Sequence, residues 1–407
     1  MKKLIVRGGT SLCGEVQISG SKNAALPILF ATLVTRGVSK IKRLPNIGDV
    51  EVALDLLREF GAVIAREGNA VYIDTRRLHY NIPSERLVSK IRASTYLLGA
   101  LLARFGKCPI MNFGGCNFSS RPIDLHILAL SSFGATLSQG ELSVKSRVPA
   151  NISFPKASVG ATANALIMAS ATEGKSRIVG HAEEPHIMAL IDFLRSAGAE
   201  ITLDGGGITV IGGELHGGAV EIVGDMIEAG SYLASAIVTG GRVSVIGSKV
   251  SQMGAYLDFL KSVGAKIEIY DEKITAERGK HPSFTTVVAE PYPSFPTDLQ
   301  PIAAPVLASL SGGVIYDKVF PDRFGYLAEL SRFGIAYSLG EGFAEIHPST
   351  FTSASAQMPD LRGGMACLLC ALSATGESNI SSAETILRGY ERLVEKLSAL
   401  GADIELS

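Results

Sequence analysis

Two patterns of apolar and polar residues alternate along the chain, and each of them recurs six times. In the first pattern, a segment with apolar residues on one face ends at a glycine and runs into alternating strands, as in residues 52–60, Gly61 and residues 63–74. The spacing predicts an amphipathic helix, and the glycine supplies the left-handed turn that ends it. The six glycines lie at nearly regular intervals, at Gly61, Gly134, Gly198, Gly264, Gly334 and Gly401.

The second pattern is a helix that is apolar on nearly every side and stops at glycine. A helix that is apolar all round is buried all round. We therefore predict an α/β fold in which each unit has one buried helix, one amphipathic helix and a few strands, with three units in each of two domains. The predicted buried helices span residues 23–37, 92–106, 159–174, 229–240, 299–312 and 361–376.

The repeat interval and the chain length predict how the units are arranged. The interval exceeds the about 20–50 residues of a solenoid repeat, so a closed globular arrangement is expected. With 407 residues the chain is too long for one ordinary core. A first strand at residues 3–7 has no unit of its own and is expected to close the last unit. The predicted domains are residues 21–223, and residues 1–20 together with residues 224–407.

Composition narrows the class of protein. The chain is 46% apolar and 19% charged, as globular proteins are, and its net charge of −1 gives no field that attracts nucleic acid or an anionic membrane. Five cysteines without a paired framework indicate a reducing compartment, and no apolar run of roughly 18 residues occurs, so a cytoplasmic protein is expected. The histidines show no metal-ligand spacing. Cys367 and Cys370 lie in an apolar helix, which favours a place in the core over a redox or metal site.

A candidate for chemistry lies in residues 113–126, which read FGGCNFSSRPIDLH. Gly114 and Gly115 permit a tight, exposed loop with Cys116 at its tip. Arg121 follows closely, and a nearby cation favours thiolate over thiol, which would make Cys116 a usable acid, base or nucleophile. A free surface cysteine in an ordinary turn is the alternative, and the residues alone leave both readings open.

Charged residues gather where the buried helices begin. Helix N-termini bind phosphate and carboxylate readily, so six of them aimed at one cleft would form an anion site. The alternative is that Asp298 and Asp360 are ordinary N-caps and that the cations are solvated surface residues. The cations that would add to such a site are Lys22, Arg92, Arg121, Arg323, Arg362 and Arg388.

Seven segments together carry a resemblance to a known family. They are GSKNAALPI (20–28), GGCNFSSRPIDLH (114–126), KASVGAT (156–162), FPTD (295–298), DRF (322–324), DLR (360–362) and RGYERL (388–393). Over nearly its whole length the chain resembles the enolpyruvyl transferases, and most closely the branch that acts on UDP-N-acetylglucosamine. The resemblance implies two inverse α/β barrel domains, each of three βαβαββ-type units around buried helices, with the active site between them.

The resemblance also implies a reaction. The enolpyruvyl group of phosphoenolpyruvate is transferred to the 3-hydroxyl of UDP-N-acetylglucosamine and phosphate is released, which is the first committed step of peptidoglycan precursor synthesis. No metal or organic cofactor is implied, and the partners are these two small molecules, without nucleic acid or membrane. A monomer is expected, with a cleft that closes on the UDP-sugar as the Cys116 loop moves.

Residue roles follow from the matching positions. Cys116 would act as proton donor at C3 and in phosphate release, and would be the residue that fosfomycin alkylates. Asp298 would take the proton of the sugar hydroxyl, and Lys22 and Arg388 would share in catalysis. The phosphoenolpyruvate ligands would be Lys22, Arg92, Arg121 and Arg388. The UDP-sugar ligands would be Asn23, Arg92, Arg121, Pro122, Ile123, Asp124, Leu125, Lys156, Ser158, Val159, Gly160, Asp298 and Val319. The residues that would steady the cleft are Arg323, Asp360 and Arg362.

Three positions depart from the family pattern. Met226 stands where arginine is frequent, Pro321 stands where glutamate is common, and residues 384–387 read ETIL where the family often has Tyr-His-Ile-Asp. These departures concern the sugar end of the site and its closing contacts. They leave open a sister enolpyruvyl transferase that uses another nucleotide or shikimate 3-phosphate. Because a fold does not fix a function, a catalytically silent paralogue that binds the UDP-sugar is a second alternative.

Overall fold

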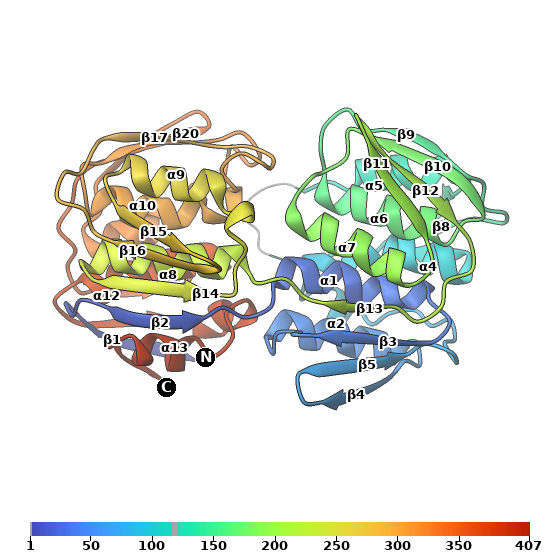
Figure 1. Ribbon diagram of the computed structural model, residues 1–407, viewed down its shortest axis with the longest axis horizontal. Helices are drawn as coiled ribbons and strands as arrows, with labels where there is room; N and C mark the ends of the chain where they lie inside the picture. Colours follow the sequence, from blue (N-terminus) through green and yellow to red (C-terminus); the bar gives the residue numbers. More distant parts are fainter. Residues whose placement is uncertain (1, 116–120) are drawn as a thin grey trace. The chain divides into compact units, whose positions relative to one another are not determined.

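A computed structural model describes residues 2–115 and 121–407 of the chain (Figure 1). It forms two compact units. The middle unit comprises Gly20–Gly115 and Arg121–Val223, and the terminal unit comprises the residues up to Ser19 together with Gly224–Ser407. The chain therefore passes from one unit to the other after Ser19 and returns after Val223.

The middle unit contains three sheets, two of four strands and one of three. The four-stranded sheets have one parallel pair at an edge, β13 with β3 and β9 with β10, and antiparallel pairs elsewhere. In sheet order, the strands are β13 (Ala219–Glu221), β3 (Val38–Lys42), β5 (Ala70–Asp74) and β4 (Val63–Glu67); β11 (Glu200–Asp204), β12 (Gly207–Gly212), β10 (Gly174–Val179) and β9 (Asn151–Ser153); and β6 (Lys107–Pro109), β8 (Glu141–Ser143) and β7 (Thr136–Ser138).

Three helices of the middle unit are buried along nearly their whole length, because their residues are small or apolar on every side. They are α1 (Lys22–Ala31), α4 (Leu97–Phe105) and α6 (Val159–Ser170). Helices that are only partly buried cover them, with α2 and α7 against α1 and α5 against α6. The remaining helices are α2 (Gly48–Glu59), α3 (Glu85–Val88), α5 (Asp124–Ser132), α7 (Pro185–Ser196), η1 (Thr32–Val34) and η2 (Arg92–Tyr96).

The terminal unit repeats this plan with three four-stranded sheets. The N-terminal strand β1 pairs antiparallel with both β22 and β23, so it closes the last unit as predicted. In sheet order, the strands are β21 (Ser355–Gln357), β22 (Gly376–Ser381), β1 (Lys3–Gly8) and β23 (Asp403–Leu406); β15 (Lys266–Tyr270), β16 (Lys273–Glu277), β14 (Arg242–Ile246) and β2 (Cys13–Gln17); and β17 (Thr285–Ala289), β18 (Gly313–Asp317), β20 (Phe343–Ile346) and β19 (Tyr337–Gly340).

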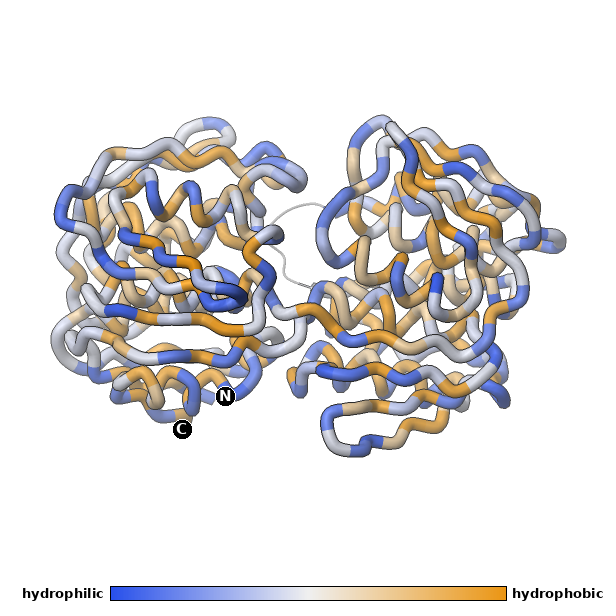
Figure 2. The backbone as a smooth tube through the Cα atoms, viewed as in Figure 1, coloured by the Kyte–Doolittle hydropathy of each residue, from blue (hydrophilic) through white to orange (hydrophobic). Residues whose placement is uncertain are grey.

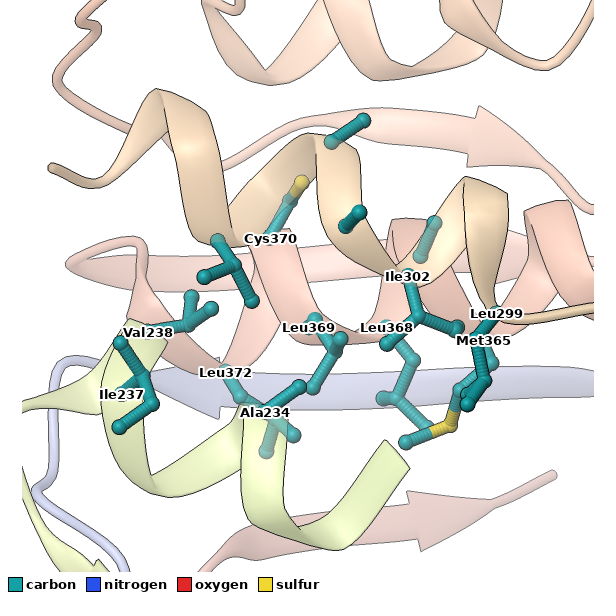
Figure 3. Close-up of a cluster of buried hydrophobic side chains, with 14 of the residues drawn as sticks. Ala234, Ile237, Val238, Leu299, Ile302, Met365, Leu368, Leu369, Cys370 and Leu372 are labelled. Atoms are coloured by element: carbon teal, nitrogen blue, oxygen red, sulfur yellow. The ribbon is translucent and has the colours of Figure 1, made fainter. Parts of the chain in front are cut away.

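Helices α8 (Met226–Thr239), α10 (Gln300–Ala308) and α12 (Leu361–Ser373) contact one another at the centre of the terminal unit. Figure 3 shows Ile237, Ile302 and Leu369, one from each helix, in the cluster that they share. Cys367 and Cys370 are fully buried there, which confirms the core reading. The remaining helices are α9 (Gly254–Ser262), α11 (Leu327–Leu330), α13 (Leu393–Ala399), η3 (Val250–Gln252), η4 (Thr297–Leu299), η5 (Ser331–Phe333) and η6 (Ala383–Arg388).

The two sequence patterns correspond to the observed elements. All six glycines after the amphipathic segments have a φ between 88° and 112°, as the predicted left-handed turn requires. Hydrophobic residues recur along the helices and strands of each unit, and hydrophilic residues are frequent at its turns (Figure 2). The starts of two buried helices differ from prediction, because residues 92–96 wind as a tighter 3₁₀ turn before α4 begins and because α8 begins at Met226 rather than at residue 229.

Two properties bear on the kind of site that the chain can hold. Among the residues that the structure describes, no helix is both long and apolar enough to cross a membrane. Over the same residues, no three His, Cys, Asp or Glu side chains gather in a way that could hold a metal ion.

Candidate functional site

In the middle unit, the predicted ligands lie at the starts of its buried helices and of α5. Lys22 opens α1 after the N-cap Ser21, whose side chain accepts a hydrogen bond from Ala24 N. The ammonium of Lys22 lies 3.2 Å from the carboxylate of Asp49 in the first turn of α2, and the two side chains are 13% and 6% exposed. Asp49 thus orients the nearly buried ammonium of Lys22. Nothing in the sequence pattern had identified Asp49.

Arg92 and Arg121 are brought together by a short segment of backbone. Arg92 Nη2 donates a hydrogen bond to the carbonyl oxygen of Arg121. Burial, and then the like charge of Arg121, lower the pKa of Arg92 to about 10, so it remains charged at neutral pH. The positive charges of Arg92 and Arg121 repel each other, and an anion bound between them would relieve that repulsion.

Gly114 and Gly115 permit this approach, as the sequence predicted for a tight turn. A Cβ on Gly114 would lie 1.7 Å from the carbonyl oxygen of Ser89. Gly115 has a φ of 115°, and a Cβ there would lie 2.7 Å from Arg121 Nη2 and 2.8 Å from Arg92 Cβ. Cys116 follows directly but lies outside the described residues.

The predicted nucleotide ligands occupy two helix starts. Ser158 is the N-cap of α6, and its side chain accepts a hydrogen bond from Ala161 N at 3.4 Å. Ile123 is the N-cap of α5, and Asp124 lies in its first turn. The remaining predicted ligands of this unit lie beside these two helix starts or at the start of α1, at Asn23, Pro122, Leu125, Lys156, Val159 and Gly160.

His126 and Asn164 connect these helix starts, although neither was predicted as a ligand. Asn164 Nδ2 lies 2.9 Å from His126 Nδ1, and a Cβ on Gly160 would lie 2.6 Å from His126 Cε1. Burial, and then the charge of Arg92, lower the pKa of His126 to about 4, so it is neutral at neutral pH. The available signal for Asn164 was an amide alone in the apolar run of α6.

In the terminal unit, Asp298 lies between two buried arginines. Its Oδ1 is 3.2 Å from Arg323 Nη1, and its Oδ2 is 3.0 Å from Arg362 Nη2 and 3.3 Å from Arg362 Nε. Both arginine side chains are 3% exposed, whereas that of Asp298 is 29% exposed. Burial acts to lower the pKa of Arg362, but the nearby charge of Asp298 and contributions from Tyr390 and Asp225 outweigh it and raise that pKa overall.

The alternative prediction was that Asp298 and Asp360 are ordinary N-caps and that the cations are solvated. It is wrong for Arg323, Arg362 and Asp298 and right for Asp360. Arg323 and Arg362 are not solvated, and Asp298 lies inside η4, whose N-cap is Pro296. Asp360, by contrast, is an ordinary N-cap, because its Oδ1 accepts hydrogen bonds from Arg362 N at 2.8 Å and Gly363 N at 3.1 Å. The N-cap sets the start of α12 and so helps to place Arg362.

Asp317 joins the Asp298 segment to the predicted ligand Val319. Its Oδ2 accepts a hydrogen bond from Thr297 Oγ1 at 2.6 Å, and its Oδ1 accepts from Val319 N at 3.0 Å and Phe320 N at 2.8 Å. Burial raises the pKa of Asp317 above its ordinary value, although these hydrogen bonds oppose the shift. Asp317 is a further positioning residue that the sequence patterns did not identify.

Arg388 and two of the departures from the family pattern, Met226 and Glu384, lie in the terminal unit. Arg388 ends η6, two residues before Tyr390. The hydroxyl of Tyr390 lies 2.8 Å from Ser231 Oγ, and its ring lies under the Arg362 guanidinium at 5.7 Å.

Met226 is the first residue of α8, after its N-cap Asp225. Glu384, the first residue of the ETIL departure, makes a contact in this structure: its Oε2 accepts a hydrogen bond from Lys2 N at 3.1 Å, beside strand β1.

The chain is similar to known proteins over its full length. Residues 6–397 match the EPSP synthase (3-phosphoshikimate 1-carboxyvinyltransferase) family. The UDP-N-acetylglucosamine 1-carboxyvinyltransferase of Prosthecochloris aestuarii is 38% identical to it, with 100% of this chain and 98% of that protein covered. The protein of the same name from Chlorobaculum parvum is 39% identical, with the same coverage.

Solved structures share the fold. The enolpyruvyl transferase NikO from Streptomyces tendae matches with a TM-score of 0.89 at 23% identity, covering 100% of this chain and 99% of that one. EPSP synthase from Acinetobacter baumannii matches with a TM-score of 0.72 at 19% identity, covering both chains completely. The chain therefore belongs to the EPSP synthase family, the enolpyruvyl transferases.

Proposed function

We propose that the protein transfers the enolpyruvyl group of phosphoenolpyruvate to the 3-hydroxyl of UDP-N-acetylglucosamine and releases phosphate. The choice of acceptor is supported by full-length relatives at 38% and 39% identity that carry this activity in their names. The observation that carries the chemistry is the convergence of Arg92 and Arg121 around Gly115, the residue before Cys116. It supplies concentrated positive charge around Gly115, and the next residue in the chain is the proposed proton donor, Cys116.

Phosphoenolpyruvate carries a phosphate and a carboxylate on adjacent carbons of one small molecule. Lys22, Arg92 and Arg121 in the middle unit and Arg388 in the terminal unit are the proposed ligands of these anions. Guanidinium groups suit both of them, because they donate paired hydrogen bonds to two oxygens at once.

Asp298 is the proposed general base. Its two arginine partners fix the direction of the carboxylate, while its 29% exposure leaves it open to the acceptor hydroxyl. As the acceptor oxygen bonds to C2 of phosphoenolpyruvate, Asp298 takes the hydroxyl proton. A proton delivered by Cys116 joins C3, which becomes a methyl group.

The second step restores the double bond. The bond from C2 to the phosphate oxygen breaks as one C3 proton returns to the Cys116 thiolate, and the departing phosphate takes up the proton held by Asp298. The products are inorganic phosphate and the enolpyruvyl ether of the UDP-sugar. In this proposal the nucleotide is bound at the starts of α5 and α6 and by Val319, and Arg323, Asp360 and Arg362 keep Asp298 in place. We further propose a cytoplasmic monomer that closes on the UDP-sugar.

Phosphate release measured against a panel of acceptors tests this function. UDP-N-acetylglucosamine with phosphoenolpyruvate should release phosphate, and fosfomycin or Cys116→Ala should suppress the release. Release with shikimate 3-phosphate or another nucleotide alone would identify a sister transferase instead. Calorimetric binding of the UDP-sugar without any turnover would identify a silent paralogue.

A further inference from the structure

Asn164 is a fully buried amide in the second turn of α6. Its Oδ1 accepts a hydrogen bond from the backbone N–H of Gly99 at 2.6 Å. Its Nδ2 lies 3.1 Å from the carbonyl oxygens of Thr95 and Gly160 and 2.9 Å from His126 Nδ1. One side chain thus uses its donors and its acceptor to join four segments of the middle unit.

The contact with Gly99 determines which atom of the Asn164 amide donates and which accepts in its other contacts. A backbone N–H can only donate, so the atom facing Gly99 is the amide oxygen, and the NH₂ group must face the remaining three partners. The Nδ1 atom of His126 therefore accepts a hydrogen bond, which places the proton of the neutral ring on Nε2. The His126 ring packs against Gly160, where a Cβ would lie 2.9 Å from Nε2.

The joined segments are those that carry the proposed nucleotide-sugar ligands. Thr95 lies in η2 with Arg92, Gly99 lies in the first turn of α4, and Gly160 lies in the first turn of α6 beside Ser158. His126 lies in the first turn of α5, two residues after Asp124. A purely apolar residue at position 164 would fill the same space in the core but could not fix the relative positions of these helix starts.

We propose that Asn164 is a positioning residue that sets the spacing of the helix starts binding the UDP-sugar and that holds His126 as its Nε2–H tautomer. The inference rests on the proposed function, because that function assigns the nucleotide to these helix starts. It goes further by assigning a role to a residue without direct substrate contact. Alignment of ligands to within a fraction of an ångström strongly affects binding and rate.

The test compares Asn164→Asp with Leu166→Ala in the full-length protein. Aspartate keeps the shape of asparagine but has no N–H groups, so it cannot donate to Thr95, Gly160 or His126. Leu166 is fully buried in the same helix and makes apolar contacts only, so its truncation lowers stability without removing the polar contacts.

Asn164→Asp should raise KM for UDP-N-acetylglucosamine by about tenfold or more, which corresponds to the loss of roughly one good hydrogen bond, with a smaller change in KM for phosphoenolpyruvate. Leu166→Ala should leave both KM values near those of the wild type.

The His126 tautomer provides a readout that needs no turnover. In ¹⁵N spectra the wild-type ring should be the Nε2–H tautomer at neutral pH, and Asn164→Asp should move the proton to Nδ1 or charge the ring. If Asn164→Asp does not fold, Asn164→Ser serves, since serine can still bond the Gly160 carbonyl one helical turn back but cannot also reach Gly99 and His126. Asn164→Ser should likewise raise KM for the UDP-sugar more than KM for phosphoenolpyruvate.

The outcomes separate this inference from the proposed function. Equal changes in both KM values in the variant that folds, matching those of Leu166→Ala, or a wild-type ring protonated on Nδ1, would overturn the positioning role. If the wild type releases no phosphate with UDP-N-acetylglucosamine, the proposed function fails. In that case the tautomer of the wild type and calorimetric titration of variant and wild type with UDP still decide whether Asn164 orders a nucleotide site.

Discussion

The carboxylate of Asp298 lies 3.0 Å from Arg362 Nη2, and the guanidinium that holds it is almost entirely buried. The arrangement is asymmetric, because the acid is the partner that remains accessible. A buried arginine is stabilised only if its charge is compensated, so Asp298 supports the fold as well as the proposed chemistry.

Asp298→Asn is expected to lower kcat by about 10²–10⁴-fold, the range for loss of a general base, with little change in KM for phosphoenolpyruvate. Steady-state phosphate release measures this, and circular dichroism checks that the variant is folded. Asp204→Asn is the matched control, since Asp204 pairs with Arg177 at 2.7 Å in an exposed ion pair. A kcat near that of the wild type in Asp298→Asn would remove Asp298 from the mechanism.

Gly115→Ala is expected to separate Arg92 from Arg121. The added Cβ would lie within 2.8 Å of both side chains, at a φ that favours glycine. Because the two guanidinium groups are proposed to share one anion, KM for phosphoenolpyruvate should rise by about tenfold or more, as when one charge-assisted hydrogen bond is lost.

The control for this change is Gly213→Ala in the same unit, where an added Cβ has nothing within 4 Å. It should leave KM for phosphoenolpyruvate unchanged. Unaltered affinity for phosphoenolpyruvate in folded Gly115→Ala would show that the spacing of Arg92 and Arg121 does not matter for substrate.

His126 makes stability depend on pH in a defined window. Its pKa is lowered from 6.5 to about 4 in the folded protein, so between these values the unfolded chain binds more protons. The stability that neutral His126 contributes is present above about pH 6.5 and is lost as the pH falls toward 4, by up to about 3 kcal/mol.

Denaturant unfolding between pH 4 and pH 7 measures this dependence, with His126→Phe as the comparison. The free energy of unfolding should fall less steeply with acidity in the variant than in the wild type. His347→Gln is the control, because His347 is 41% exposed on its side chain and should not alter the slope. Parallel pH curves for the wild type and His126→Phe would contradict the buried, neutral state of His126.

The sequence predicted the parts of the fold that depend on periodicity. All-apolar runs identified buried helices such as α12, and regularly spaced glycines marked helix ends, because both features follow from local geometry. The closing of the last sheet by β1 was also predicted, from a strand left without a unit. The 3₁₀ start before α4 was missed, since no residue pattern separates a tight turn from the helix that it opens.

Polar contacts between distant segments were not predicted from the sequence. Asp49 beside Lys22, Asp317 beside Thr297 and Asn164 beside His126 are polar pairs made by packing, and no spacing along the chain indicates them. Motifs propose candidate ligands, whereas the residues that hold those motifs in place are recognised once the fold brings them together. A lone amide in an apolar helix was the one such signal that the sequence offered.

Phosphate release by the purified protein as a function of both substrates tests the proposed reaction most directly. We expect release only when UDP-N-acetylglucosamine and phosphoenolpyruvate are both present, with its loss in Cys116→Ala and Asp298→Asn and full retention in Asp204→Asn. Release that does not depend on the UDP-sugar, or equal release in Asp298→Asn, would contradict it.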